Sequence, residues 1–125
     1  MEKIISGTLA LDLGNTNTVI AFQSEKDKDI VLLEIPGITT SPGVIPTIVW
    51  FERNTNTTII GKSALRMKNC DNSEINFHSN FKRLIGNPDE YQKFKALSPS
   101  QSGENFFRIL WENIPQQFDI KRLVL

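Results

Sequence analysis

The chain has 125 residues, of which 39% are apolar and 22% are charged, and its 14 Lys and Arg residues balance its 14 Asp and Glu residues. This length suffices for one domain with its own core. A protein that binds nucleic acid or an anionic membrane mainly through charge carries a basic excess. Because this chain has none, we expect neither partner, and any anion site must be built locally from a few groups.

The chain contains one cysteine, Cys70, and one histidine, His78. An internal disulfide is therefore excluded, and the spacing of a Cys/His metal site is absent. The first residues lack the apolar segment of a signal peptide, and no apolar run approaches the length of a membrane span. These features predict a cytoplasmic protein.

The first third of the chain predicts an antiparallel meander of three strands. Two apolar, β-prone segments at 8–13 and 18–23 are separated by residues 14–17 (Gly-Asn-Thr-Asn), and this spacing predicts a hairpin because Gly and Asn tolerate positive φ. A third strand is predicted at 30–35, after a charged turn. Residues 36–46 are rich in Pro, Gly, Thr and Ser, so we expect neither helix nor strand there.

The middle of the chain predicts a series of short elements. They are a hairpin of strands at 47–51 and 57–60, a helix at 61–68, a loop at 69–79, a brief ordered segment at 81–85, and a helix from Pro88 through Phe94.

The most regular helical pattern spans 103–113. Ser102 is its predicted N-cap, and Glu104 falls in the first turn, where the helix dipole favours an anion. Its predicted buried face consists of Phe106, Phe107, Leu110 and Ile114, and Pro115 marks its end. Residues 121–125 predict a strand, which we expect to lie parallel to 8–13. Because this strand ends the chain in apolar residues, we expect the chain to be part of a longer protein.

Asp12 stands at the end of the first apolar strand, where a carboxylate is unfavourable unless it is paired, hydrated or near a metal. Gly14 then allows a ligand to approach the backbone, and Asn15, Thr16 and Asn17 add polar side chains to the N–H groups of the turn. Such a turn can hold phosphate oxygens, with the carboxylate near Mg²⁺ through its waters. The same residues also fit a plain hairpin turn that Asp12 caps.

Residues 11–18 (Leu-Asp-Leu-Gly-Asn-Thr-Asn-Thr) resemble the first phosphate loop of the superfamily of actin, hexokinase and heat-shock chaperones. Later segments resemble the heat-shock protein 70 (DnaK-type) chaperones in the same order. They are the Thr- and Pro-rich bend at 39–42 and 45–51, the strand-to-helix step at 60–64, the Phe-Lys-Arg-Leu-Ile-Gly segment at 81–86, and the helix and strand at 103–113 and 121–125. The resemblance covers nearly the whole chain.

This resemblance implies an α/β fold with a partial ribonuclease H-like, actin-like ATPase core, in which a parallel strand joins the three-stranded meander. Residues 1–35 and 101–125 would form the core lobe, and 36–100 would form an inserted small subdomain. The resemblance also implies an ATP-binding part of a molecular chaperone, whose full-length relatives hydrolyse ATP and act on unfolded client peptides with co-chaperones.

The resemblance also implies the roles of individual residues toward ATP or ADP. It places Asp12 near Mg²⁺, through water, and it assigns four loop residues to the β- and γ-phosphates: Gly14, Asn15, Thr16 and Asn17. Lys82 takes the place of the catalytic lysine, where a cation offsets charge in the transition state of phosphoryl transfer. From the residues alone, Lys82 also fits a solvated surface lysine beside Arg83.

Two features depart from the family pattern. Threonine usually stands where this chain has Asn15, and the segment 89–101 is shorter than its counterpart. The second phosphate loop, the adenosine contacts and the peptide-binding domain have no counterpart in these residues. We therefore expect the isolated chain to be inactive as an ATPase and to self-associate through the open edge of strand 121–125.

Two alternative functions remain open. Residues 12–19 also resemble the opening loop of type III pantothenate kinases, although 81–86 and the Pro-rich bend are typical of the chaperones. A truncated chain could also act as a non-enzymatic interaction module, because a site between two lobes needs both lobes.

Overall fold

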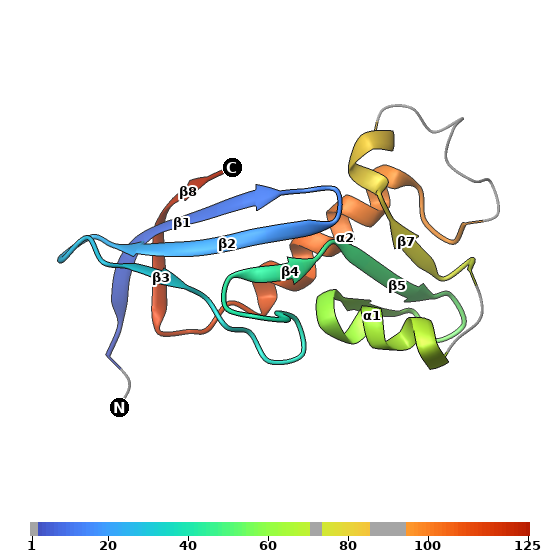
Figure 1. The fold of residues 1–125 in the computed structure, drawn as a ribbon, viewed down its shortest axis with the longest axis horizontal. Coiled ribbons are helices and arrows are strands. Elements are labelled where there is room, and N and C mark those ends of the chain that lie inside the picture. Colours follow the sequence, from blue (N-terminus) through green and yellow to red (C-terminus); the bar gives the residue numbers. More distant parts are fainter. Residues whose placement is uncertain (1–2, 71–73, 86–94) are drawn as a thin grey trace.

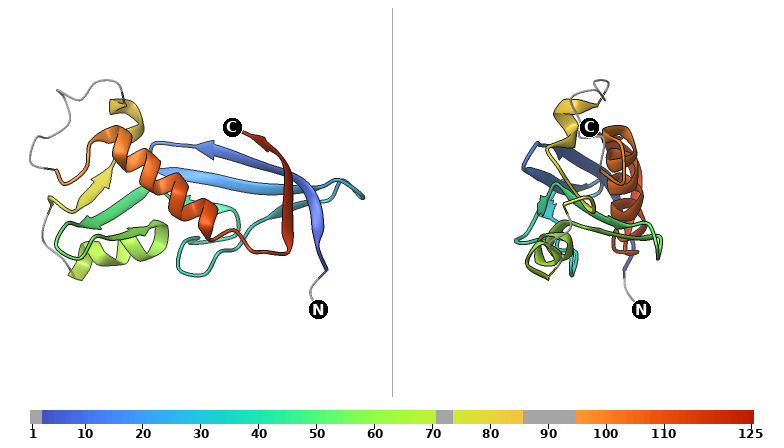
Figure 2. Two further views of the ribbon diagram at one scale, coloured as in Figure 1. Left: turned by 180° about the vertical axis from the view of Figure 1, so that it is seen from behind. Right: turned by 90° about the vertical axis from the view of Figure 1, so that its right-hand side faces the viewer.

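The computed structural model describes residues 3–70, 74–85 and 95–125. Two β-sheets lie next to each other, and helix α2 lies behind them in Figure 1 and in front of them in the reverse view of Figure 2. The larger sheet has the strand order β3-β2-β1-β8 with β4 paired to β2, and the smaller sheet has the order β6-β5-β7. The fold is mixed α/β, as predicted.

The larger sheet contains β1 (Ile5–Leu13), β2 (Asn17–Ser24), β3 (Ile30–Leu32), β4 (Val44–Pro46) and β8 (Phe118–Val124). β1 and β2 are antiparallel, β2 and β3 are antiparallel, and β8 lies parallel to β1. The predicted meander and the parallel last strand are therefore confirmed. β3 is shorter than predicted because it ends at Leu32, and β8 begins at Phe118 rather than at residue 121.

β4 shows that the expectation of neither helix nor strand at 36–46 is wrong for its last three residues, 44–46, and it holds for 36–43. β3 pairs with residues 21–23 of β2 and β4 pairs with residues 17–19, so the two short strands share one edge of β2. Gly43, with a φ of +74°, turns the chain between them, and its N–H and C=O groups bond with Leu33 and Ile20. The partner of β4 is distant along the chain, so local composition does not reveal this strand.

The smaller sheet contains β5 (Ile48–Glu52), β6 (Thr57–Ile60) and β7 (Phe77–Ser79). The predicted hairpin of β5 and β6 is confirmed, and α1 (Gly61–Cys70) follows β6 directly. The predicted loop at 69–79 is wrong in its second half, because β7 pairs antiparallel with β5. A 3₁₀ helix, η1 (Phe81–Leu84), occupies the predicted ordered segment. The predicted helix from Pro88 lies outside the described residues.

Helix α2 (Pro99–Glu112) begins before the predicted 103, and its N-cap is Ser98 rather than Ser102. The Ser98 hydroxyl accepts a hydrogen bond of 3.1 Å from the Gln101 N–H, and the Gln101 side chain accepts one of 2.9 Å from the Ser98 N–H. Proline suits the first helical position because it needs no N–H partner. Ser102 instead donates its hydroxyl to the Ser98 carbonyl oxygen at 2.9 Å.

One apolar core joins α2 to both sheets. Phe106 and Leu110 of α2 are 0% and 1% exposed, which confirms the predicted apolar face. The buried cluster combines β1 and β2, the two strands of the smaller hairpin and η1, represented by Leu9, Leu11, Ile20, Phe22, Val49, Ile60 and Phe81. Burial of each such side chain contributes roughly 1.5–3 kcal/mol, so this cluster holds the two sheets in one body.

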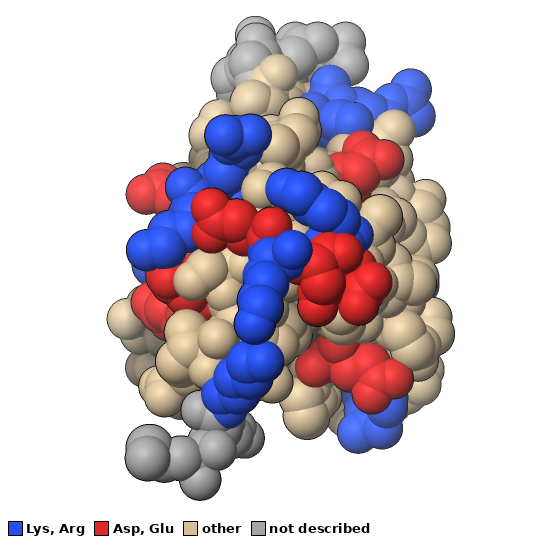
Figure 3. Space-filling model, turned by 90° about the vertical axis from the view of Figure 1, so that its left-hand side faces the viewer, with Lys and Arg blue, Asp and Glu red and all other residues tan. Residues whose placement is uncertain are grey.

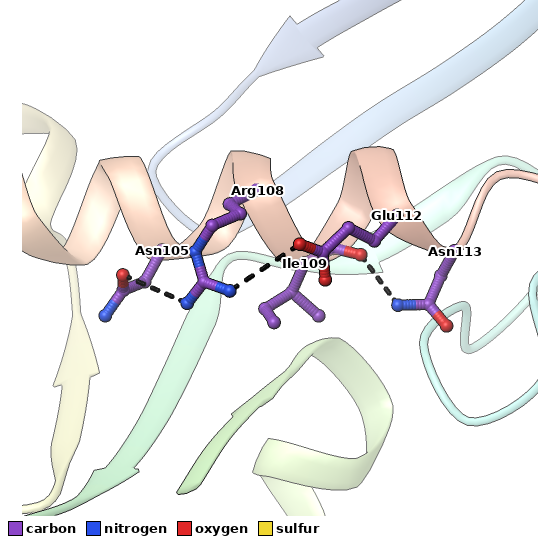
Figure 4. Close-up of polar contacts among 5 residues, drawn as sticks. All are labelled: Asn105, Arg108, Ile109, Glu112 and Asn113. Atoms are coloured by element: carbon purple, nitrogen blue, oxygen red, sulfur yellow. Dashed lines mark hydrogen bonds and ion pairs between the residues drawn. The ribbon is translucent and has the colours of Figure 1, made fainter. Parts of the chain in front are cut away.

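The opposite face of α2 is solvated. Figure 4 shows Arg108 between Asn105 and Glu112, with distances of 3.4 Å to the Asn105 amide oxygen and 3.7 Å to the Glu112 carboxylate. Asn113 donates to the Ile109 carbonyl oxygen at 2.7 Å. Exposed pairs of this kind add little stability but keep the outer face polar. No helix in the described part of the chain combines the length and apolar character needed to cross a bilayer.

Candidate functional site

The loop between β1 and β2 is the first part of the predicted site. The last residue pair of the hairpin is Leu13 with Thr18, so residues 14–17 close the turn. A Cβ atom on Gly14 would collide with the backbone oxygen of Asn17, and this close approach explains the glycine. Asn15, Thr16 and Asn17 are exposed. The turn therefore presents a tightly closed backbone and polar side chains to solvent.

Thr47, between β4 and β5, holds this loop through two contacts. Its N–H donates to the Thr16 carbonyl oxygen at 2.9 Å, and its hydroxyl lies 2.8 Å from the Thr18 hydroxyl. Thr47 and Thr18 are 1% and 0% exposed, so this hydroxyl pair satisfies groups that burial would otherwise destabilise. Sequence analysis missed this role. The only local sign is a hydroxyl residue within an apolar run.

Asp12 lies on the exposed face of β1, opposite Val19 of β2. Leu9 and Leu11 both lie on the buried face of the strand. Because successive side chains of a strand point to opposite faces, the Asp12 carboxylate points to solvent. Among the residues that the structure describes, no three His, Cys, Asp or Glu side chains lie together as a metal-binding group. A Mg²⁺ ion held by phosphate oxygens and water needs only one or two carboxylates. Asp12 fits that role but not an all-protein metal centre.

Lys82 lies on η1, which is anchored by its neighbour Phe81. The Phe81 ring is fully buried, with its centroid 6.2 Å from that of Phe106 in α2, whereas Lys82 is exposed. Figures 1 and 2 place η1 near the β1–β2 loop, which lies toward the middle of the long axis where the two sheets meet. Within the described residues, Lys82 makes no hydrogen bond or ion pair with that loop. The fold thus brings Asp12 together with residues 14–17 and leaves Lys82 on a separate element near them.

The chain was also compared with known proteins. No model of a known protein family matches it, and no curated protein matches it.

Proposed function

We propose that this chain is the ATP-binding portion of an actin-like ATPase domain of the heat-shock protein 70 type. In this proposal the β1–β2 loop holds the β- and γ-phosphates of ATP, Asp12 lies near the accompanying Mg²⁺ through water, and Lys82 faces the γ-phosphate. The cofactors are ATP or ADP and Mg²⁺. A longer protein of this kind would act on unfolded client peptides with co-chaperones.

The observation that carries the proposal is the Gly14 turn next to Asp12. Gly14 allows the tight turn, because a Cβ atom there would collide with the Asn17 backbone oxygen, and the Thr47 N–H fixes the loop at Thr16. Backbone N–H groups of a tight turn are good partners for phosphate oxygens because they carry partial positive charge in a fixed arrangement. An exposed carboxylate on the same strand then supplies the ligand that a hydrated Mg²⁺ prefers.

Lys82 would act on the transferring phosphoryl group. An ammonium at that position offsets the negative charge that develops on the γ-phosphate oxygens, so its contribution belongs to the transition state. η1 and the loop are held by different contacts, Phe81 with Phe106 and Thr16 with Thr47. Their relative position therefore depends on the shared core.

The isolated chain should bind nucleotide weakly and should not hydrolyse it at an appreciable rate. Asn15, Thr16, Asn17 and Lys82 are all exposed, so they do not by themselves exclude water from a bound phosphate. Few contacts would offset the entropy lost on association. We therefore expect a Kd in the millimolar range, which corresponds to a binding free energy on the order of −4 kcal/mol.

The test is a titration of the ¹⁵N-labelled chain with Mg²⁺ and ADP, followed by NMR. We expect saturable shifts at the amides of residues 12–17 that depend on Mg²⁺. Asn17→Ala should lower the affinity for the nucleotide that these shifts report. Asn54→Ala should not lower it, because Asn54 is an exposed polar residue in the turn between β5 and β6. Asn15→Thr, which restores the residue typical of the family, should preserve or strengthen binding.

Two results would contradict the proposal. One is the absence of saturable shifts in the loop at nucleotide concentrations of about 10 mM. The other is an equal loss of binding in Asn17→Ala and Asn54→Ala, since this would show that the loop has no special role.

A further inference from the structure

A small polar cleft lies on the exposed face of the larger sheet, near the start of β1. Its volume is about 160 Å³, and six of the residues around it are Thr8, Gln23, Glu25, Lys28, Lys121 and Arg122. Thr8 lies on the same face of β1 as Asp12, four residues earlier in the strand. The cleft and the β1–β2 loop share no residue, so this cleft is a separate feature of the molecule.

A β-bulge between β1 and β8 brings two of the cations together. Gly7 pairs with Ile120, and the next residue, Thr8, pairs with Arg122, so Lys121 has no partner in β1. In a regular strand, Lys121 and Arg122 would point to opposite faces. The extra residue re-aims the strand and allows both side chains to line the same cleft. Two cations held side by side repel each other, and an anion between them would relieve this repulsion.

The third cation comes from the turn between β2 and β3. Lys28 has a φ of +62°, in the left-handed region that favours glycine. Its N–H donates to the Ser24 carbonyl oxygen at 3.0 Å, and the Gln23 side-chain amide donates to the Lys28 carbonyl oxygen at 3.2 Å. The turn that carries the ammonium is therefore fixed from both sides.

The charges around the cleft favour a small anion. Its three cations face one carboxylate, Glu25, and Lys121 also pairs with Asp119 at 3.1 Å. Figure 3 shows that Lys and Arg alternate with Asp and Glu over this end of the molecule, so the local positive charge does not extend into a basic face for a polyanion. The volume lies below the roughly 300–1,000 Å³ of sites for drug-sized ligands.

We propose that this cleft binds a small phosphate group, either as inorganic phosphate or as a compact phosphate monoester. The Arg122 guanidinium can donate to two phosphate oxygens from its planar fork, and Lys28 and Lys121 add two mobile positive charges. Thr8 lies among the residues around the cleft, and its hydroxyl adds a neutral donor. Binding holds the β2–β3 turn against the bulge of β8, so the ligand also bridges the strands on either side of β1.

The test is an NMR titration of the ¹⁵N-labelled chain with inorganic phosphate at constant ionic strength. We expect saturable shifts at the amides of Thr8, Lys28 and Arg122. Arg122→Gln should lower the affinity by at least about tenfold, because the loss of even one charged hydrogen bond has this effect. Lys28→Gly should also lower it, and this variant should remain folded because glycine relieves the positive φ. A parallel titration with glycerol phosphate distinguishes the two ligand forms: tighter binding of the ester assigns the site to monoesters.

Two further variants make the test specific. Arg108→Gln removes the same charge from the solvated face of α2 and should leave the affinity unchanged. Asp119→Asn should raise the affinity, because it releases Lys121 from its carboxylate partner. The proposal is overturned if phosphate causes no saturable shift at the cleft, or if Arg108→Gln weakens binding as much as Arg122→Gln does. Unchanged affinity in Asp119→Asn would overturn the role of Lys121.

Discussion

The His78 imidazole joins three segments of the chain that are distant in sequence. It lies on β7, its Nδ1 is 3.3 Å from the Val49 carbonyl oxygen of β5, and its Nε2 accepts a hydrogen bond of 3.0 Å from the Leu97 N–H. A neutral ring with the proton on Nδ1 satisfies both contacts. Protonation would direct a ring N–H at the Leu97 N–H, so acid should break the link between β7 and the segment before α2.

This arrangement predicts a pH-dependent stability. Burial is the main cause that lowers the pKa of His78 from its usual 6.5 to about 4, and the Lys95 ammonium adds to it, against the hydrogen bond to Val49. The folded chain then binds fewer protons than the unfolded chain between these values. The free energy of unfolding should therefore fall as the pH falls from 6.5 to 4, by as much as about 3 kcal/mol.

Urea unfolding of the wild type and of His78→Gln at several pH values between 4 and 7 measures this effect. The variant should be less stable at neutral pH and should lose most of the slope in this window. The Asp27 and Asp119 carboxyls titrate below it, because the Asp29 N–H and the Lys121 ammonium, respectively, lower their pKa values from 3.8. An unchanged slope in His78→Gln would show that other groups cause the dependence.

At the scale of single elements, the start of α2 depends on a capping box. Ser98 and Gln101 each satisfy a backbone N–H of the other, and Pro99 occupies the first helical position. Ser98→Ala removes the acceptor for the Gln101 N–H and should lower the free energy of unfolding by about 1 kcal/mol. Ser100→Ala is the matched control, because Ser100 is exposed within the first turn and alanine favours helix there. Urea unfolding of both variants measures the difference, and equal stabilities would show that the capping box contributes nothing.

At the scale of the whole molecule, β8 presents an open edge. Among the described strands it pairs only with β1, and Leu123, Val124 and Leu125 are 44%, 49% and 82% exposed. Next to it, Trp111 of α2 contributes to an apolar groove of about 420 Å³. An unpaired edge beside exposed apolar side chains favours association with another chain, so we expect the isolated chain to self-associate.

Sedimentation velocity over a range of concentrations tests this expectation. The mean mass of the wild type should rise with concentration, and Leu123→Lys should shift the chain toward monomer because it places a charge at the open edge. Leu65→Lys is the matched control, since Leu65 is 41% exposed on α1, away from β8. A wild type that stays monomeric throughout, or an equal effect of both variants, would contradict a role for the β8 edge.

Much of the fold follows from local sequence patterns. Alternating Leu9 and Leu11 predict a strand with one buried face, and the polar residues 14–17 predict the turn after it. The change of pattern between Ile60 and Gly61 predicts the end of β6 and the start of α1, and the spacing of Phe106 and Leu110 predicts α2. These signals are local because side-chain periodicity and turn conformation depend on residues close in sequence. The β1–β2 loop of the candidate site is predictable for the same reason.

The elements missed by sequence analysis depend on partners distant along the chain. β4 and β7 are strands only because β2 and β5 offer them open edges. The N-cap of α2 is a different case. Ser98 is marked by local signals, Pro99 at the first helical position and Gln101 three residues after Ser98, and the prediction of Ser102 overlooked them.

The sequence by itself determined the hairpin of β1 and β2, the strand character of the last segment and the composition of the β1–β2 loop, because these depend on periodicity and turn chemistry. Only the tertiary structure decided that Thr47 supports this loop and that His78 is buried. It also decided that a bulge directs the side chains of Lys121 and Arg122 to the same cleft. These features depend on which segments meet in space. That outcome is set by burial of a core shared between both sheets and α2, and a linear pattern does not contain it.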